Sequence, residues 1–169
     1  MLKYMITDPK FSMDEIKKAV IKHNPDFVCY RNKLYYDENE IIEFAKFAKK
    51  YSKLIINYDS LKNKNLLKYF DGIHFPSSKL DEIKKYDTLT IASTHNISEV
   101  KKACAADYIT FSPVFNSKGR VGVGIEKLNE ITTFHHNVLA LGGIVSNKEV
   151  EIIKNSKAKG FASIRYFFT

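Results

Sequence analysis

The sequence predicts an α/β fold, namely a compact (β/α)8 TIM barrel that occupies residues 1–169 as a single domain. Three observations predict it. Short runs of apolar or β-branched residues occur eight times, amphipathic segments separate them, and the order of strand then helix repeats along the chain. Because strands that alternate with helices form a parallel sheet, and eight such strands close on themselves, the pattern indicates a barrel.

The predicted strands are short and closely spaced. They cover residues 4–7, 27–30, 54–57, 72–75, 89–93, 108–112, 138–142 and 160–164. No linker interrupts the series, and 169 residues suit one domain with one sizeable core. A doubly wound open sheet is the alternative, but no GxGxxG motif follows the first strand, and strand repeats continue to the last residues.

Amphipathic helices are expected between these strands. Apolar residues recur three and four positions apart, for example from 16 to 20 and from 41 to 48, as in helices that pack on a sheet. Residues that favour helix N-termini precede several of these segments. The candidate capping residues are Ser12, Asn96 or Ser98, and Ser146.

Two parts of a full barrel are reduced or absent. The first strand begins almost at Met1, so an N-terminal plug helix is expected to be absent. Only residues 165–169 follow the eighth strand, so the final helix is expected to be absent or vestigial, whether the chain is natural or truncated. A barrel strand needs an apolar layer over its outer face. We therefore expect a homodimer to cover the seam between strands eight and one, or the aromatic residues 166–168 to fold back over it.

Charge and cysteine content exclude several classes of function. The net charge is +8, but lysine pairs such as Lys49-Lys50 lie among acidic residues, as on solvated helix faces, so no nucleic acid is expected. Cys29 and Cys104 lie in apolar segments without metal-ligand spacing and are expected to be core thiols.

The chain has neither the roughly 18 apolar residues of a membrane span nor a signal peptide, which predicts a cytoplasmic protein without a membrane partner.

The residues just after each strand form the reactive face of a TIM barrel. All three arginines of the chain, Arg31, Arg120 and Arg165, lie at such positions. Because the planar guanidinium group binds phosphate well, their placement indicates an anionic ligand.

A phosphate site is predicted at the ends of strands seven and eight. Gly142 and Gly143 let backbone N–H groups approach a phosphate, and the amides around Ser163 and Ile164 complete the site. A tight strand-to-helix turn is the structural alternative for the two glycines. In the long segment 111–124, Lys118 is the candidate cation for the same ligand, unless it is merely solvated.

His95 is the candidate proton carrier. It follows the fifth strand, and a histidine at a strand end can gain or lose a proton near neutral pH. His74 lies inside the fourth strand, where either it or Phe75 points inward, and it is interpreted as a hydrogen-bonded core residue.

Several segments resemble the thiamine phosphate synthase/TenI family in their order along nearly the whole chain. The segments are YMITD (4–8), YRNK (30–33), IIN (55–57), DGIH (71–74), STHN (93–96), ADYITFSPVF (106–115) and ALGGI (140–144). The resemblance implies a barrel that binds a small phosphorylated thiazole or thiamine phosphate. It also implies substrate binding by Arg31, Lys33, Asn57, Ser93 and Ser117.

The family resemblance implies two activities with different requirements. Synthases couple an aminopyrimidine methyl diphosphate to a thiazole phosphate, and the departing diphosphate calls for Mg²⁺ held by carboxylates. They carry acids directly after the third strand and shortly after the fourth. Here these positions hold Tyr58-Asp59 and Ser77-Ser78, and the diphosphate loop is shortened to residues 116–118.

TenI-type tautomerases aromatise a thiazole carboxylate phosphate, which requires a proton acceptor and donor but no metal. His95 and the phosphate site supply these elements, and Pro76-Ser77-Ser78 is similar to the TenI branch. The sequence therefore predicts a thiazole tautomerase without a cofactor or metal site. The alternatives are a Mg²⁺-dependent thiamine phosphate synthase and a non-catalytic barrel that binds thiazole or thiamine phosphate.

Overall fold

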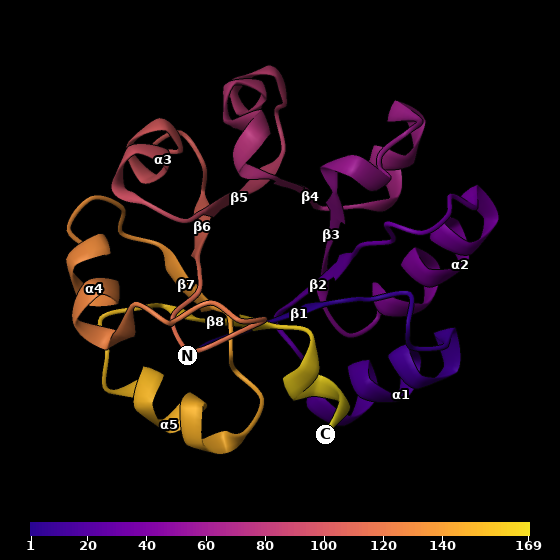
Figure 1. Cartoon of the computed structure of the whole chain (residues 1–169). Coiled ribbons are helices and arrows are strands. Elements are labelled where there is room, and N and C mark those ends of the chain that lie inside the picture. The colour runs from indigo at the N-terminus through magenta and orange to yellow at the C-terminus, as the bar shows by residue number, and fades with distance from the viewer.

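In the structure, a computed structural model that describes residues 1–169, eight parallel strands form one closed barrel (Figure 1). The strands are β1 Leu2–Ile6, β2 Phe27–Tyr30, β3 Lys53–Asn57, β4 Gly72–Phe75, β5 Leu89–Thr94, β6 Tyr108–Phe111, β7 Val138–Leu141 and β8 Gly160–Ser163. Each pairs with its neighbours in the sequence, and β1 pairs with β8 so that Leu2 lies opposite Gly160. The predicted (β/α)8 barrel is confirmed.

The connections on the outside of the barrel are short, as a chain of this length requires. Five α-helices surround the strands (Figure 1): α1 Met13–His23, α2 Glu38–Ala48, α3 Ile97–Lys102, α4 Gly124–Ile131 and α5 Asn147–Lys154. Tight 3-10 turns replace α-helices after β3 and β4, at Tyr58–Ser60, Lys64–Tyr69 and Ser77–Lys85. None of these helices combines the length and the apolar character that a membrane-spanning helix requires.

Side-chain caps fix the starts of α1, α3 and α5, the helices whose caps the sequence predicts. The hydroxyl of Ser12 accepts a hydrogen bond from the N–H of Glu15, whose carboxylate accepts from the N–H of Ser12, and Ser146 forms the same capping box in α5. Asn96, rather than Ser98, caps α3, because its side chain accepts from the N–H of Glu99.

The apolar residues form two separate layers. Strand residues that point outward pack against the helices, whereas those that point inward fill the barrel, as the two-residue period of a strand requires. Cys29 belongs to the inner group and is a core thiol, as predicted. The same prediction is wrong for Cys104, which is exposed because the turn after α3 directs its neighbour Ala103 into the core instead.

The seam between β8 and β1 is covered by the chain itself. Residues Arg165–Phe168, here called the C-terminal turn, form a 3-10 turn beside α1 (Figure 1). Phe167 is buried against Phe161 of β8, with ring centroids 5.9 Å apart. Of the two expected kinds of cover, the structure shows the one in which the aromatic residues fold back. The homodimer stays a prediction.

Candidate functional site

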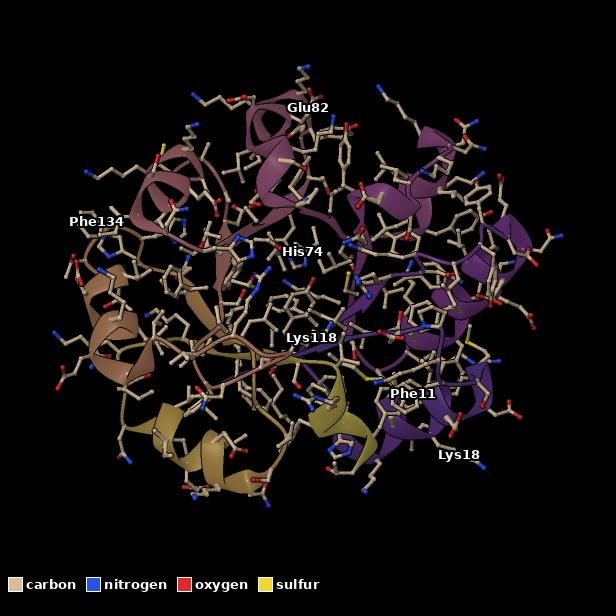
Figure 2. All side chains as sticks on the ribbon, in the orientation of Figure 1. Phe11, Lys18, His74, Glu82, Lys118 and Phe134 are labelled. Carbon is tan, nitrogen blue, oxygen red and sulfur yellow. The ribbon has the colours of Figure 1, made fainter.

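The carboxyl ends of the eight strands open on one face of the barrel, here called the mouth. The residues predicted to bind or react lie at the ends of β2, β3, β5, β7 and β8 or in the loop between β6 and α4. In the view along the barrel, His74 and Lys118 both lie near the centre of the ring (Figure 2). The topology thus gathers residues distant in sequence at a common opening.

The segment after β7, Gly142–Ile144, is here called the glycine loop. Gly142 and Gly143 have φ angles of 92° and 74°, which residues with a side chain rarely adopt. A Cβ on Gly142 would lie 2.7 Å from Cα of Pro113. The glycines therefore make the tight turn that was the structural alternative and let the β6–α4 loop pack close by.

The backbone donors of the glycine loop are free. The N–H groups of Gly142 and Gly143, and that of Ile164 after β8, donate to no backbone or side-chain acceptor. Free amides from two adjacent strand ends are what an anion-binding nest needs. This arrangement fits the phosphate site that was predicted here.

Ser163 contributes to this region through its hydroxyl in a structural way. Its Oγ donates to the carbonyl of Ile144 at 2.8 Å and accepts from the N–H of Tyr166 at 3.2 Å. Because the hydroxyl is buried and engaged, a ligand would meet the backbone near Ser163 rather than its side chain.

Lys118 lies at the tip of a tight turn in the β6–α4 loop. The backbone N–H and C=O groups of Ser117 and Arg120 bond to each other in both directions, at 3.0 and 2.9 Å. Lys118 and Gly119 between them have φ angles of 50° and 76°, a geometry in which both central residues are left-handed. The turn fixes the backbone of Lys118 and leaves its side chain exposed near the barrel axis (Figure 2).

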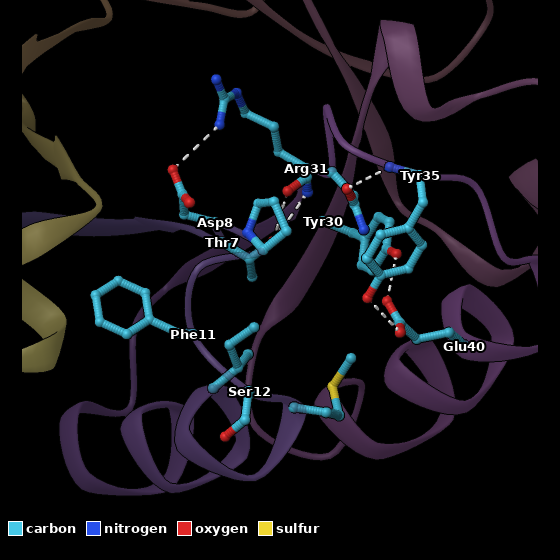
Figure 3. A pocket seen from close by; sticks show the side chains of 12 residues that line it. Thr7, Asp8, Phe11, Ser12, Tyr30, Arg31, Tyr35 and Glu40 are labelled. Carbon is cyan, nitrogen blue, oxygen red and sulfur yellow. Dashed lines mark hydrogen bonds and ion pairs between the residues drawn. The ribbon is translucent and has the colours of Figure 1, made fainter.

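Arg31 directly follows β2. The ends of β8 and β1 lie between it and the glycine loop, which follows β7. Its Nη1 is 3.6 Å from the carboxylate of Asp8, and its N–H donates to Oγ1 of Thr7 at 2.9 Å (Figure 3). These residues line a pocket of about 110 Å³ together with Phe11. About a fifth of the Arg31 side chain is exposed, so the guanidinium remains available to an anion.

Lys33 and Asn57 occupy less central positions. Lys33 lines a separate surface pocket of about 420 Å³ beside Asp59 and Lys62. Asn57 is buried, and its Oδ1 accepts from the N–H of Asp59, so its side chain caps the turn after β3. Neither residue is brought to the glycine loop.

His95 forms a pair with a carboxylate. Its Nδ1 lies 2.9 Å from Oε2 of Glu99, which also accepts from the N–H of His95 at 2.7 Å. The pair requires a donor at Nδ1, while Nε2 has no partner and about two fifths of the side chain is exposed. This is the arrangement of a histidine whose orientation and tautomer are set by a neighbour.

His74 is fully engaged inside the barrel. Its Nδ1 bonds to the hydroxyl of Tyr4 at 2.8 Å, and its Nε2 bonds to Oγ of Ser93 at 2.8 Å. Burial, and secondarily the charge of Arg31, lowers the pKa of His74 from its usual 6.5 to about 4, so that it is neutral at pH 7. The interpretation of His74 as a hydrogen-bonded core residue is confirmed.

The connection from Tyr4 through His74 to Ser93 was not predicted from the sequence. Ser93 is expected from the family resemblance to bind substrate. In the structure its hydroxyl bonds to Nε2 of His74 and forms one end of this chain of hydrogen bonds. Strand alternation does point Tyr4, His74 and Ser93 inward, but contact between β1 and β4 follows only from barrel closure.

Comparison with known proteins agrees with this fold. A family model described as thiamine monophosphate synthase matches residues 3–167. A solved structure of thiamine phosphate pyrophosphorylase from Pyrococcus furiosus is similar, with a TM-score of 0.75 and 20% identity, over 96% of this chain and 85% of that one. For the thiamine phosphate pyrophosphorylase from Bacteroides thetaiotaomicron the TM-score is 0.70 at 22% identity, covering 98% of this chain and 84% of that one.

The fold also extends beyond these enzymes. The 2-keto-3-deoxy-6-phosphogluconate aldolase of Zymomonas mobilis is similar with a TM-score of 0.66 at 12% identity, over 95% of this chain and 79% of that one. No curated protein matches the chain. At such identities the solved structures bear on the fold alone.

Proposed function

Because the chain belongs to the thiamine monophosphate synthase/TenI family, we propose that it is a thiazole tautomerase, which moves a proton within a phosphorylated thiazole without a metal ion. Membership places it in a family of thiamine biosynthesis. The choice among the family's activities rests on the residues at the mouth.

The observation that carries the proposal is the pairing of His95 with Glu99. A tautomerisation removes a proton from one carbon and delivers a proton to another, so it needs a base that becomes an acid. The carboxylate of Glu99 holds Nδ1 of His95 in its protonated form and leaves Nε2 as the acceptor. A proton taken up there gives an imidazolium, which the same carboxylate stabilises.

His74 is less suited to this role. Both of its ring nitrogens are bonded to protein groups, and its lowered pKa disfavours the protonated form that must return the proton. In the proposed reaction it maintains the barrel core.

The substrate phosphate would bind at the glycine loop. The free N–H groups of Gly142, Gly143 and Ile164 provide neutral donors, and Lys118 would approach from the tip of the β6–α4 loop. Arg31 would meet a second anionic group, as the carboxylate of a thiazole carboxylate phosphate would be.

Mg²⁺-dependent coupling is the second candidate, favoured by the description of the family model. It needs carboxylates that can hold the ion together. The turns after β3 and β4 offer the exposed carboxylate of Asp59 and the hydroxyls of Ser77 and Ser78. One carboxylate in place of the two acids that synthases carry there would hold Mg²⁺ less well, which supports the metal-free proposal. A non-catalytic barrel that binds thiazole or thiamine phosphate is the third candidate.

Product analysis separates the candidates. The protein is incubated with one tautomer of the thiazole carboxylate phosphate in the presence of a chelator, and separately with thiazole phosphate, pyrimidine diphosphate and Mg²⁺. The proposal predicts conversion in the first reaction. Efficient formation of thiamine phosphate in the second would support the synthase, and binding without turnover in either would support the third candidate.

A further inference from the structure

The C-terminal turn, Arg165–Phe168, contacts two loops of the mouth in addition to covering β8. Figure 1 shows it as the yellow segment beside α1. Its side chains reach the segment after the glycine loop in one direction and the loop between β1 and α1 in the other. A segment that only covered the barrel seam would need neither contact.

Tyr166 makes the contacts to the glycine loop. Its N–H donates to Oγ of Ser163, which in turn donates to the carbonyl of Ile144. Its hydroxyl donates to Oδ1 of Asn147 at 2.9 Å, at the start of α5. The chain just after Gly142 and Gly143 is thus held at two points, and both lead to Tyr166.

Phe168 makes the contact to the β1–α1 loop. Its ring stacks on Phe11, with centroids 3.6 Å apart and planes within 4°. The N–H of Phe11 donates to the carbonyl of Asp8, whose carboxylate pairs with Arg31. Phe11, Asp8 and Arg31 line the same pocket (Figure 3). The stacking therefore supports the loop that orients the Arg31 guanidinium.

Phe167 anchors the C-terminal turn between these two contacts. It is buried, stacks on Phe161 and meets the ring of His23 edge-on. The Nζ of Lys22 also donates to the carbonyl of Thr169 at 3.0 Å. The ring of Tyr166 packs edge-on against Phe161 and Phe167, with centroids 5.0 and 5.2 Å away, and phenylalanine at this position would keep those contacts. Tyr166→Phe therefore removes the hydroxyl while the turn stays in place.

We propose that the C-terminal turn is a positioning element of the mouth, in which Tyr166 orders the glycine loop and Phe168 orders the β1–α1 loop and with it Arg31. The ligand roles of these loops rest on the proposed function. The positioning itself does not, because it concerns contacts within the protein.

Amide hydrogen exchange tests the positioning directly. Tyr166→Phe removes one hydrogen bond and should speed exchange of the bonded amides of Val145 and Ser146 roughly three- to tenfold, without changing exchange at Lys10 and Phe11. Phe168→Ala should speed exchange of the bonded amides of Lys10 and Phe11 by a similar factor and leave that of Val145 and Ser146 unchanged. Phe134→Ala, at an exposed aromatic residue outside these contacts, is the control and should affect neither segment.

A titration with inorganic phosphate adds the functional readout. Tyr166→Phe should weaken phosphate binding roughly three- to tenfold, and Phe168→Ala should not. Should the unaltered protein fail to bind phosphate, the phosphate site and the proposed function fail, while the exchange data still decide the positioning. If amide exchange is unchanged in both segments and in both variants, the positioning role of the C-terminal turn is wrong. If Phe168→Ala lowers folding overall, Phe168→Leu, which keeps apolar contact but loses ring stacking, replaces it with the same expectation.

Discussion

Nδ1 of His95 lies 2.9 Å from Oε2 of Glu99, a residue one helical turn further along the chain. The contact ties the end of β5 to the first turn of α3 and determines which ring nitrogen is free. The proposed chemistry depends on this relationship, and replacing each of the two residues tests its part separately.

Replacement of His95 by Asn should remove the proton carrier. We expect turnover of the thiazole carboxylate phosphate to fall by roughly two to four orders of magnitude, with phosphate affinity nearly unchanged. Steady-state kinetics and a phosphate titration measure the two effects. His136→Asn, at an exposed histidine after α4, is the matched control and should retain full activity. Comparable activity in both variants would exclude His95 as the carrier.

Glu99→Gln should test whether the carboxylate orients His95. The amide can still accept from Nδ1 but cannot stabilise an imidazolium as a carboxylate does, so we expect kcat to fall at least about tenfold, equivalent to about 1.4 kcal/mol, with KM little changed. Glu99 also accepts from the N–H of His95 at the start of α3. Thermal unfolding therefore accompanies the kinetics, and a loss of stability with unaltered kcat would assign Glu99 a purely structural role.

The burial of His74 predicts a loss of stability in acid. Its pKa is lowered in the folded protein to about 4, below the usual value of 6.5, so the unfolded chain binds the proton more readily. The stabilisation is present above pH 6.5 and is lost as the pH falls toward 4, by about 3 kcal/mol. Urea unfolding at pH 7 and pH 4 measures it. In His74→Asn the change between these pH values should be smaller, and an equal change would contradict the burial argument.

Gly143 and Gly119 form a natural comparison. Their φ angles are nearly the same, 74° and 76°, so an added methyl group meets similar backbone strain of about 1 kcal/mol at both. A Cβ on Gly143 would lie 2.6 Å from Cβ of Phe115, whereas nothing lies within 4 Å at Gly119. Gly143→Ala should therefore lower the free energy of unfolding by about 1–3 kcal/mol more than Gly119→Ala. Equal losses in chemical denaturation would show that the β6–α4 loop can move aside.

The fold could be predicted from the sequence because each strand and helix has its own periodicity and the order repeats. The start of α1 was predictable from Ser12 for the same local reason. Contacts across the barrel interior could not be predicted in this way. Tyr4 and His74 are 70 positions apart, and their hydrogen bond depends on barrel closure and on which inward-pointing side chains lie at the same height along the barrel axis.

The surface contacts were predictable only in part. Aromatic residues after β8 indicated that the seam needs cover, but the stacking of Phe168 on Phe11 depends on the path of the C-terminal turn along α1. The pairing of His95 with Glu99 has a sequence pattern, a spacing of four across a helix start, and could have been predicted from it.

The most direct test of the proposed function is product analysis after incubation of the purified protein with the non-aromatic tautomer of the thiazole carboxylate phosphate and a chelator. We predict conversion to the aromatic tautomer at a rate that the chelator does not change and that His95→Asn nearly abolishes. Absence of conversion, together with efficient Mg²⁺-dependent formation of thiamine phosphate from thiazole phosphate and pyrimidine diphosphate, would contradict the proposal and identify the chain as a synthase.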